Sequence, residues 1–443
     1  MNAPYEYYKM LTDIDTDLSH KSGQRMEEYI KNSEAVYHGI VVRSLYIPKI
    51  FTETAAELFS SLTKTMYTIL KKVIAEYESN SEYRKLFGFE PRLEELILRK
   101  SRYEQLLPLS RLDIFFNDED YSFKFCEFNA DGASAMNEDR ELNNALLLSD
   151  TFTKFKEKYN VRTYELFHSW AEEFINIYNT SDNPLQKPNI VITDFFTHDV
   201  GYEFKRFRSA FADKGLNCEI VDITKLEYDG RYLTTPSGMR VDAIYRRAVT
   251  CDIMEHYDEV QPFINAVKDD NVILIGDFKT QIIHNKIIFK VLHDNMTSKI
   301  LDSDEVDFIR QHIPFTTVLT ADTAEKYNVF SDKDSWVIKP EDSYASKGFH
   351  AGVECKTSAE WVEAVKNNIG NGYILQEYVK PYEILNIDYL HEDNPRYRNY
   401  SSITGLFVYN GKFSGIYSRI TKTSIISTQY SEMSLPSIVV SEK

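Results

Sequence analysis

Acidic and amide side chains recur at two-residue spacing on a predicted β-hairpin, and their chemistry suits a metal ion. Residues 112–116 and 121–128 are rich in aromatic and aliphatic residues and flank an acidic, turn-forming run. Alternate residues of a strand share a face, so Glu127 and Asn129 lie together and Asp113 can join them. Two carboxylates and an amide are oxygen ligands that Mg²⁺ accepts, with water and nucleotide phosphates completing its octahedron. By spacing alone, a solvated acidic strand face is the alternative.

Cationic residues near other predicted strands suit phosphate chemistry. Arg111 shares a strand face with Asp113, where its guanidinium could hold a carboxylate or a transferring phosphoryl group; a surface ion pair is the alternative. Lys339 ends a predicted strand, and the polar loop 341–350 follows it. In that loop Lys347 could neutralise phosphate charge and Gly348 would let the backbone approach closely. The loop matches neither a Walker A motif nor a GxGxxG fingerprint, so the pattern alone is nonspecific.

The elements expected to position these residues alternate between strands and helices. A long amphipathic helix is predicted over about 52–78, because apolar residues recur there at three- and four-residue spacing. Buried strands at 189–194 and 218–222 flank a helix near 203–213, an order that predicts a parallel βαβ unit. Further strands are predicted at 241–245, 272–275, 336–339, 373–377, 404–409 and 412–417. The last two are joined by Asn-Gly, a signature of the type I′ turn, and the whole pattern is α+β.

Composition and charge narrow the function classes. The chain has 443 residues, of which 43% are hydrophobic, enough for a large core and two or three lobes. A formal charge of −17 argues against a nucleic-acid partner, because phosphate neutralisation needs clustered Lys and Arg. The four cysteines are widely separated and suggest neither a zinc site nor a disulfide framework. No apolar signal core and no membrane-length apolar window is visible, so we expect a cytoplasmic protein without a membrane partner.

Taken together, the motifs resemble a known enzyme family. The order Arg111-x-Asp113, Glu127-x-Asn129-x-Asp131 with Ser134 and Glu138, then Asn285-Lys286, Lys339-Pro340 and Gln376-Glu377 is similar to the synthetase domain of glutathionylspermidine synthase. The resemblance covers about residues 100–420. It implies a circularly permuted ATP-grasp fold with a Rossmann-like pre-ATP-grasp lobe. The implied division is 1–180 with the metal-binding hairpin, 181–280 as the pre-ATP-grasp lobe, and 281–443 as the ATP-binding lobe.

The resemblance also implies a role for each matching residue. Asp113, Glu127 and Asn129 would hold Mg²⁺, and Arg111 would steady an acyl phosphate as the catalytic residue. ATP would be bound by Lys286, Lys339, Ser346, Lys347, Gly348, Gln376, Glu377 and Val379. Substrate would contact Asp131, Ser134, Glu138 and Arg247. Arg246, Arg398 and Arg419 could also recognise an acid substrate, because carboxylates favour arginine forks, and structural ion pairs are the alternative.

The expected activity is an ATP-dependent carboxylate–amine ligase that works through an acyl phosphate. Its partners would be small-molecule or peptide acids and amines; the sequence does not identify them and says nothing about oligomeric state. Around Asp131 the family's Thr/Pro-rich run is replaced by residues 132–136, and the loop 341–350 has fewer glycines than in the family. Glutathione and spermidine are therefore not assumed as substrates. A phosphotransferase on the same scaffold and a catalytically silent nucleotide-binding protein are the alternatives.

Overall fold

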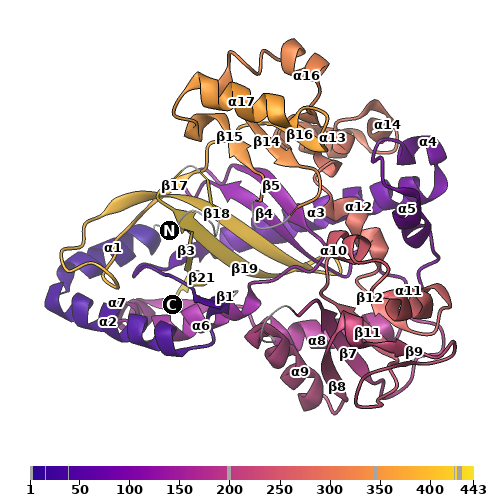
Figure 1. The fold of residues 1–443 in the computed structure, drawn as a ribbon. Coiled ribbons are helices and arrows are strands. Elements are labelled where there is room, and N and C mark those ends of the chain that lie inside the picture. Colours follow the sequence, from indigo (N-terminus) through magenta and orange to yellow (C-terminus); the bar gives the residue numbers. More distant parts are fainter. Residues whose placement is uncertain are drawn as a thin grey trace.

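The structure is a computed structural model that describes residues 3–14, 16–37, 39–196, 201–343, 347–423, 425–426 and 432–443. Figure 1 shows a long central antiparallel sheet, a smaller lobe at one side of it, an α/β lobe below and a helical region near both termini. None of the helices in these ranges combines the length and apolar character that a membrane crossing requires.

The central sheet joins strands from distant parts of the sequence. Its order is β20 (Met433–Leu435), β19 (Lys412–Thr421), β18 (Arg398–Tyr409), β4 (Leu109–Phe116) and β5 (Phe123–Asn129), and β17 (Glu383–Asn386) also pairs with β18. Both predicted hairpins are confirmed, since β4 pairs with β5 and β18 with β19. Asn410 and Gly411 have φ angles of 47° and 79°, as a type I′ turn requires. The antiparallel pairing of β4 with β18 then brings the two hairpins into one sheet.

Helices cover this sheet and link it to a second one. The predicted long helix is α3 (Glu53–Ser79), and its buried face includes Leu62, Met66, Ile69 and Val73 at three- and four-residue spacing. The side chain of Thr52 caps it by accepting the Ala55 amide at 3.2 Å. A three-stranded sheet lies beside it, with β21 (Ser437–Glu442) between β3 (Lys49–Thr52) and β6 (Tyr159–Arg162). The helices near it are α1 (Ala3–Asp13), α2 (Thr16–Asn32), α6 (Met136–Leu146) and α7 (Asp150–Lys158).

The α/β lobe is built on a parallel sheet. Its order is β12 (Ile273–Ile275), β11 (Ala243–Arg246), β7 (Ile190–Asp194) and β8 (Cys218–Asp222). The predicted βαβ unit is confirmed, because α9 (Tyr202–Asp213) connects the parallel neighbours β7 and β8. The same lobe contains α8 (Phe167–Tyr178), α10 (Thr250–Glu255), α11 (Gln261–Lys268), β9 (Glu227–Tyr228) and β10 (Leu233–Thr234). Beyond the carboxyl end of β11, the Thr250 amide donates to Asp131, which lies just after β5 of the central sheet.

The smaller lobe is an antiparallel sheet backed by two helices (Figure 1, top). Its order is β13 (Thr316–Val318), β16 (Tyr373–Glu377), β14 (Trp336–Pro340) and β15 (His350–Ala351), with α16 (Ala321–Lys326) and α17 (Ser358–Asn368) packed on it. Shorter elements complete the fold: β1 (Val36–Tyr37), β2 (Ile40–Val41), α4 (Ser81–Arg84), α5 (Pro91–Ile97), α12 (Gln281–His284), α13 (Ile288–Leu292), α14 (Asn295–Ser298) and α15 (Ser303–His312).

Candidate active site

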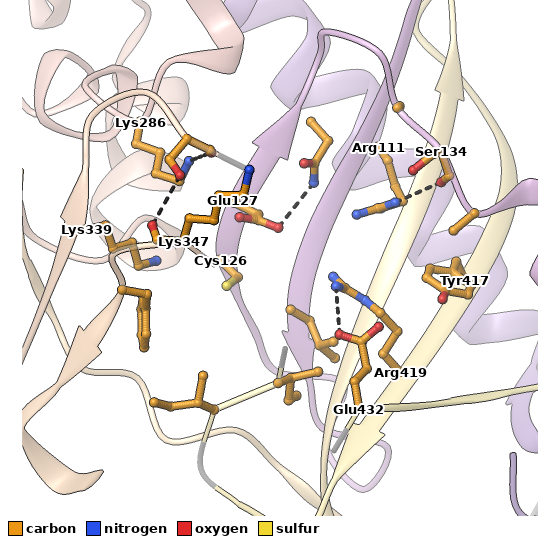
Figure 2. A pocket seen from close by; sticks show the side chains of 18 of the residues that line it. Arg111, Cys126, Glu127, Ser134, Lys286, Lys339, Lys347, Tyr417, Arg419 and Glu432 are labelled. Carbon is orange, nitrogen blue, oxygen red and sulfur yellow. Dashed lines mark hydrogen bonds and ion pairs between the residues drawn. The ribbon is translucent and has the colours of Figure 1, made fainter. Parts of the chain in front are cut away.

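One large cavity, of about 980 Å³, gathers most of the residues expected from the sequence. Its walls come from the central sheet, the start of α6, the segment before α13 and the smaller lobe. The predicted site residues that line it are Arg111, Glu127, Asn129, Asp131, Ser134, Glu138, Lys286, Lys339, Lys347, Gln376, Glu377 and Val379. Gly348 lies next to Lys347, and Ser346 falls outside the described residues. Figure 2 shows lysines at one end of the cavity and arginines at the other.

Glu127 occupies the middle of this charge distribution. It stands on β5 opposite Asp113 of β4, so the predicted common strand face is confirmed. Burial by itself would raise its pKa, but Lys286, Arg419 and Lys339 outweigh that effect and lower the pKa of Glu127 to about 2. Its carboxylate therefore stays ionised at neutral pH and balances cations from three different elements.

The two predicted phosphate-binding lysines reach the cavity from different elements. Lys339, at the end of β14, donates to Gln376 Oε1 at 2.8 Å, and Gln376 Nε2 donates to Thr316 Oγ1 at 2.9 Å. Lys286 Nζ donates to the carbonyl of Ser343 (Figure 2). Burial lowers the pKa of Lys286, so this ammonium gains from an anion placed beside it. Both ammonium groups are oriented by the loop and strand on which ATP binding was expected.

The arginine end of the cavity is built around a carboxylate that does not reach the cavity surface. Asp113 is fully buried, and Arg111 donates to it through Nε at 2.7 Å and Nη2 at 3.1 Å. Arg419 of β19 donates to the same carboxylate at 2.5 Å, and Asn129 Nδ2 lies 3.2 Å from it. Gly405 makes room for this group, since a Cβ there would lie 2.8 Å from Arg111 Cδ. Asp113 thus holds two guanidinium groups in place.

Arg419 keeps unused hydrogen-bonding capacity at the cavity wall. Its Nε has no partner among the described residues, and its Nη1 lies 3.5 Å from Glu432 Oε2, too far for a normal hydrogen bond. Burial raises the pKa of Glu432. Glu432 and Tyr417 were not expected at the site, and both line the cavity (Figure 2). Arg111 and Arg419 lie 5.6 and 5.7 Å from the ring centre of Tyr417, which supports both side chains.

Glu138 lies in the first turn of α6 and is only 5% exposed. Burial, reinforced by the charge of Glu203, raises the pKa of Glu138 to about 8. The loop before it is tied to the arginine end, because Arg111 Nη1 donates to the Ser134 carbonyl at 2.9 Å. The predicted substrate residues Ser134 and Glu138 thus share one part of the cavity with Arg111.

Two residues expected to bind substrate, Asp131 and Arg247, have structural partners in the α/β lobe. Asp131 forms a buried ion pair with Arg246, and its carboxylate also accepts the Thr250 amide at 2.5 Å. Arg247 is not among the residues that line the cavity; it lies 2.7 Å from Glu203, whose other oxygen accepts the Met136 amide at 2.8 Å. Both residues fasten the start of α6 to the α/β lobe. Sequence spacing could not show this, because the partners come from other strands and helices.

A further polar group beside the lysines was not expected. Gln281 Nε2 donates to Asp342 Oδ2 at 2.5 Å, and His284 lies near them and lines the cavity. Burial raises the pKa of Asp342 and lowers the pKa of His284. Among the described residues, Asp342 Oδ1, Gln281 Oε1 and His284 Nδ1 have no hydrogen-bond partner. Isolated His, Gln and Asp residues carry no spacing signal, so only the fold identifies this group.

Comparisons with known proteins identify the fold. No protein-family profile and no curated protein sequence matches the chain. The structure is similar to that of a glutathione synthetase-like effector from Globodera pallida in its apo form, with a TM-score of 0.62 and 12% identity over 96% of this chain and 97% of that one. D-cycloserine synthetase matches 56% of this chain and 89% of its own (TM-score 0.30, 12% identity). D-alanyl-alanine synthetase A from Vibrio cholerae matches 54% and 69% (TM-score 0.31, 13% identity). Those two scores are too low to carry an argument.

The chain therefore has an α+β ATP-grasp fold, as the sequence predicted. The comparison does not single out the glutathionylspermidine synthase family. Because 12% identity reports on the fold alone, the activity has to be argued from the cavity.

Proposed function

We propose that the protein is an ATP-dependent ligase that joins a carboxylic acid to an amine. The observation that carries this proposal is the cavity itself, in which two lysines and a carboxylate at one end face two arginines at the other. A nucleoside triphosphate with its Mg²⁺ suits the end formed by Lys286, Lys339 and Glu127. An acid or its phosphorylated form suits Arg111 and Arg419. A single cavity thus offers both halves of an acyl-activation reaction.

The nucleotide end fits Mg·ATP when the phosphates themselves complete the metal's shell. In the described part of the chain, no three His, Cys, Asp or Glu side chains are grouped closely enough to hold a metal alone. Magnesium commonly takes only one or two protein carboxylates beside substrate phosphates, and Glu127 and Asn129 face the cavity in that role. Asp113, the third expected ligand, is engaged by Arg111 and Arg419, so we assign it to positioning them.

In the proposed reaction the protein mainly positions groups and stabilises charge. Mg·ATP would supply the phosphoryl group that turns the acid into an acyl phosphate. Lys286 and Lys339 stabilise negative charge on the nucleotide, and Arg111 and Arg419 hold the acid and then the phosphorylated acyl group. Gln376, Glu377 and Val379, at the end of β16, bind the adenine, and Lys347 contacts the phosphates. Closure over the cavity keeps water from the acyl phosphate until an amine attacks.

The test is ADP release by purified protein with Mg·ATP and mixed pools of acids and amines. We expect ADP only when an acid and an amine are both present, and no ADP with Glu127→Ala or Lys286→Met. Lys290→Met, one turn beyond Lys286 and outside the cavity lining, is the matched control and should retain activity. ADP release that needs the acid but no amine would favour a phosphotransferase. Absence of Mg·ATP binding, measured by calorimetry, would refute the proposal.

A binding-only protein is the second candidate, and one observation favours it. Each lysine of the nucleotide end already has an internal acceptor, Ser343 for Lys286 and Gln376 for Lys339. A scaffold that binds nucleotide without turnover would show Mg·ATP binding, no ADP with any pool, and unchanged binding when acids are added. In the ligase, acid and Mg·ATP bind cooperatively, because they share the cavity.

A further inference from the structure

We propose that Glu138 accepts the proton of the attacking amine, which makes it the base of the ligation step. The inference rests on the proposed ligase function and deepens it, because nothing in the motif pattern assigned a base. It stands on the position of Glu138 in the cavity and on the absence of a charge partner in the described part of the chain.

Glu138 lies in the same part of the cavity as Arg111, the residue that would hold the acyl phosphate. Its side chain lines the cavity from the first turn of α6, four residues after Ser134, whose carbonyl is bound by Arg111. The start of α6 is also fixed by Glu203, which accepts the amides of Met136 and Asn137 at 2.8 and 3.3 Å. Glu138 is therefore held at the cavity wall without taking part in the capping itself.

Three other carboxylates near Arg111 and Arg419 are less suitable as bases. Asp113 is bound by two arginines and does not reach the cavity surface. Glu127 is surrounded by three cations that lower its pKa to about 2, so it holds a proton weakly. Glu432 lies within 3.5 Å of Arg419. Glu138 differs from all three, because no described cation forms an ion pair with it and the one hydrogen bond acting on its pKa comes from its own backbone amide.

Burial favours proton uptake by Glu138, and the surrounding charges act in both directions. Arg111 of β4 and Arg247 of β11 lower its pKa, and Glu203 of α9 raises it. On its own helix Asp139 is buried with a raised pKa, and Tyr417 of β19 also faces it. Burial dominates, and the pKa of Glu138 rises to about 8. This pKa lies much closer to the pKa of an ammonium group than the pKa of an ordinary carboxyl group does. Such a match favours effective proton transfer near neutral pH.

The chemical step balances with Glu138 as acceptor. A protonated amine, R–NH3+, gives one proton to Glu138 in its ionised form, which with a pKa of about 8 is the minor form at pH 7 and the major form above pH 8. The freed lone pair of the amine forms the new C–N bond at the acyl carbon. The C–O bond to phosphate breaks, and the second proton of the nitrogen leaves with that group as HPO4 2−. Glu138 returns its proton to solvent as the products depart. No oxidant, reductant or further reactant is needed.

Hydroxylamine separates this role from a structural one. Its nitrogen is unprotonated at neutral pH, so it attacks an acyl phosphate without a base. The product is a hydroxamate, which is measured by the absorbance of its iron(III) complex. We expect Glu138→Gln to form hydroxamate at nearly the wild-type rate, using the acid fraction that supports wild-type ADP release. With an amine that is protonated at pH 7, amide formation by the variant should fall by about 10²–10⁴-fold.

Asp139→Asn is the matched control for this experiment. Asp139 is the neighbouring buried carboxyl with a raised pKa, but it lies outside the cavity lining and is bound by Asn143 at 3.0 Å. We expect it to change neither rate. If Glu138→Gln lowers hydroxamate and amide formation equally, or lowers neither, the proposal is wrong. If the wild type itself makes no acid-dependent hydroxamate, the ligase function is what fails.

A titration of the full chain tests the proposal without any substrate. The protein is labelled with ¹³C at the glutamate carboxyl groups, and the resonance of Glu138 is assigned as the one that is absent from Glu138→Gln. This resonance should titrate near pH 8. A midpoint near the ordinary glutamate value would overturn the proposal even if the ligase reaction is found.

Discussion

Two arginines on neighbouring parts of the molecule, Arg246 and Arg419, show how the same type of side chain serves either the stability of the fold or the candidate site. Arg246, at the end of β11, is almost completely buried and uses its donors on the carbonyls of Ala248, Gly276 and Asp277, two threonine hydroxyls and Asp131. Arg419, on β19, shares Asp113 with Arg111 and keeps an unpartnered Nε among the described residues. The first is a closed structural anchor, and the second retains binding capacity at a cavity wall.

Loss of Arg246 should show the largest effect, and it should fall on stability. Arg246→Met leaves Asp131 buried without its ion-pair partner, which typically costs about 3–5 kcal/mol. We expect urea denaturation to show that loss of unfolding free energy. The double variant with Asp131→Asn should recover part of it; an additive further loss would contradict the anchor role.

Loss of Arg419 should fall on activity. Arg419→Met leaves Asp113 paired with Arg111, so the unfolding free energy should fall less than for Arg246→Met. The ADP release rate should drop by about 10²–10³-fold, the size seen when one donor to a developing charge is removed. Arg398→Met is the control. Arg398 pairs with Glu392 at 2.7 Å, its side chain is 38% exposed, and it does not line the cavity. Equal activity losses in the two variants would remove the distinction.

The pH dependence of stability tests the cavity carboxyls in opposite directions. Glu138 binds its proton more tightly in the folded state, so its contribution is present below the unfolded pKa near 4.5 and is lost as pH rises toward 8. Wild-type unfolding free energy should decline relative to Glu138→Gln across pH 5–8, by at most about 1.4 kcal/mol per pH unit. Glu127, with a pKa lowered to about 2, contributes above the unfolded value and loses that contribution between pH 5 and 2. Parallel pH curves for wild type and Glu138→Gln would show that Glu138 is not perturbed.

The smallest effect is expected for an arginine on the surface. Arg162 pairs with Glu53 at 2.8 Å, with both side chains more than 40% exposed. Arg162→Ala should change the unfolding free energy by less than about 1 kcal/mol, because water and salt screen exposed pairs. A larger loss in urea denaturation would show that burial is a poor guide to the role of the arginines in this protein.

Local patterns made much of the fold predictable. Apolar spacing predicted α3, the strand–helix–strand order predicted the parallel pairing of β7 and β8, and Asn410-Gly411 predicted the tight turn between β18 and β19. Each of these signals acts over a few residues, through helix periodicity, burial or a positive φ angle. A common strand face for Asp113 and Glu127 was predicted in the same way, and the structure pairs the two residues directly.

Roles that depend on distant partners were not predictable. Arg247 was expected at the substrate, yet it pairs with Glu203, and Asp131 pairs with Arg246. Glu432 and Tyr417 carried no signal at all, although both line the cavity. Residue type gives the charge of a side chain, but its partner depends on which strands and helices meet.

The sequence by itself determined the helices, the hairpins, the parallel unit and the kinds of chemistry available, because these depend on neighbours in the chain. Only the tertiary structure decided which arginines face the cavity. The pairing of β4 with β18, and of β18 with β19, brings Arg419 to Asp113 across 306 residues, and the α/β lobe encloses Arg246 and Arg247. Such contacts form because separate elements bury their apolar faces together, and local spacing does not record where that burial occurs.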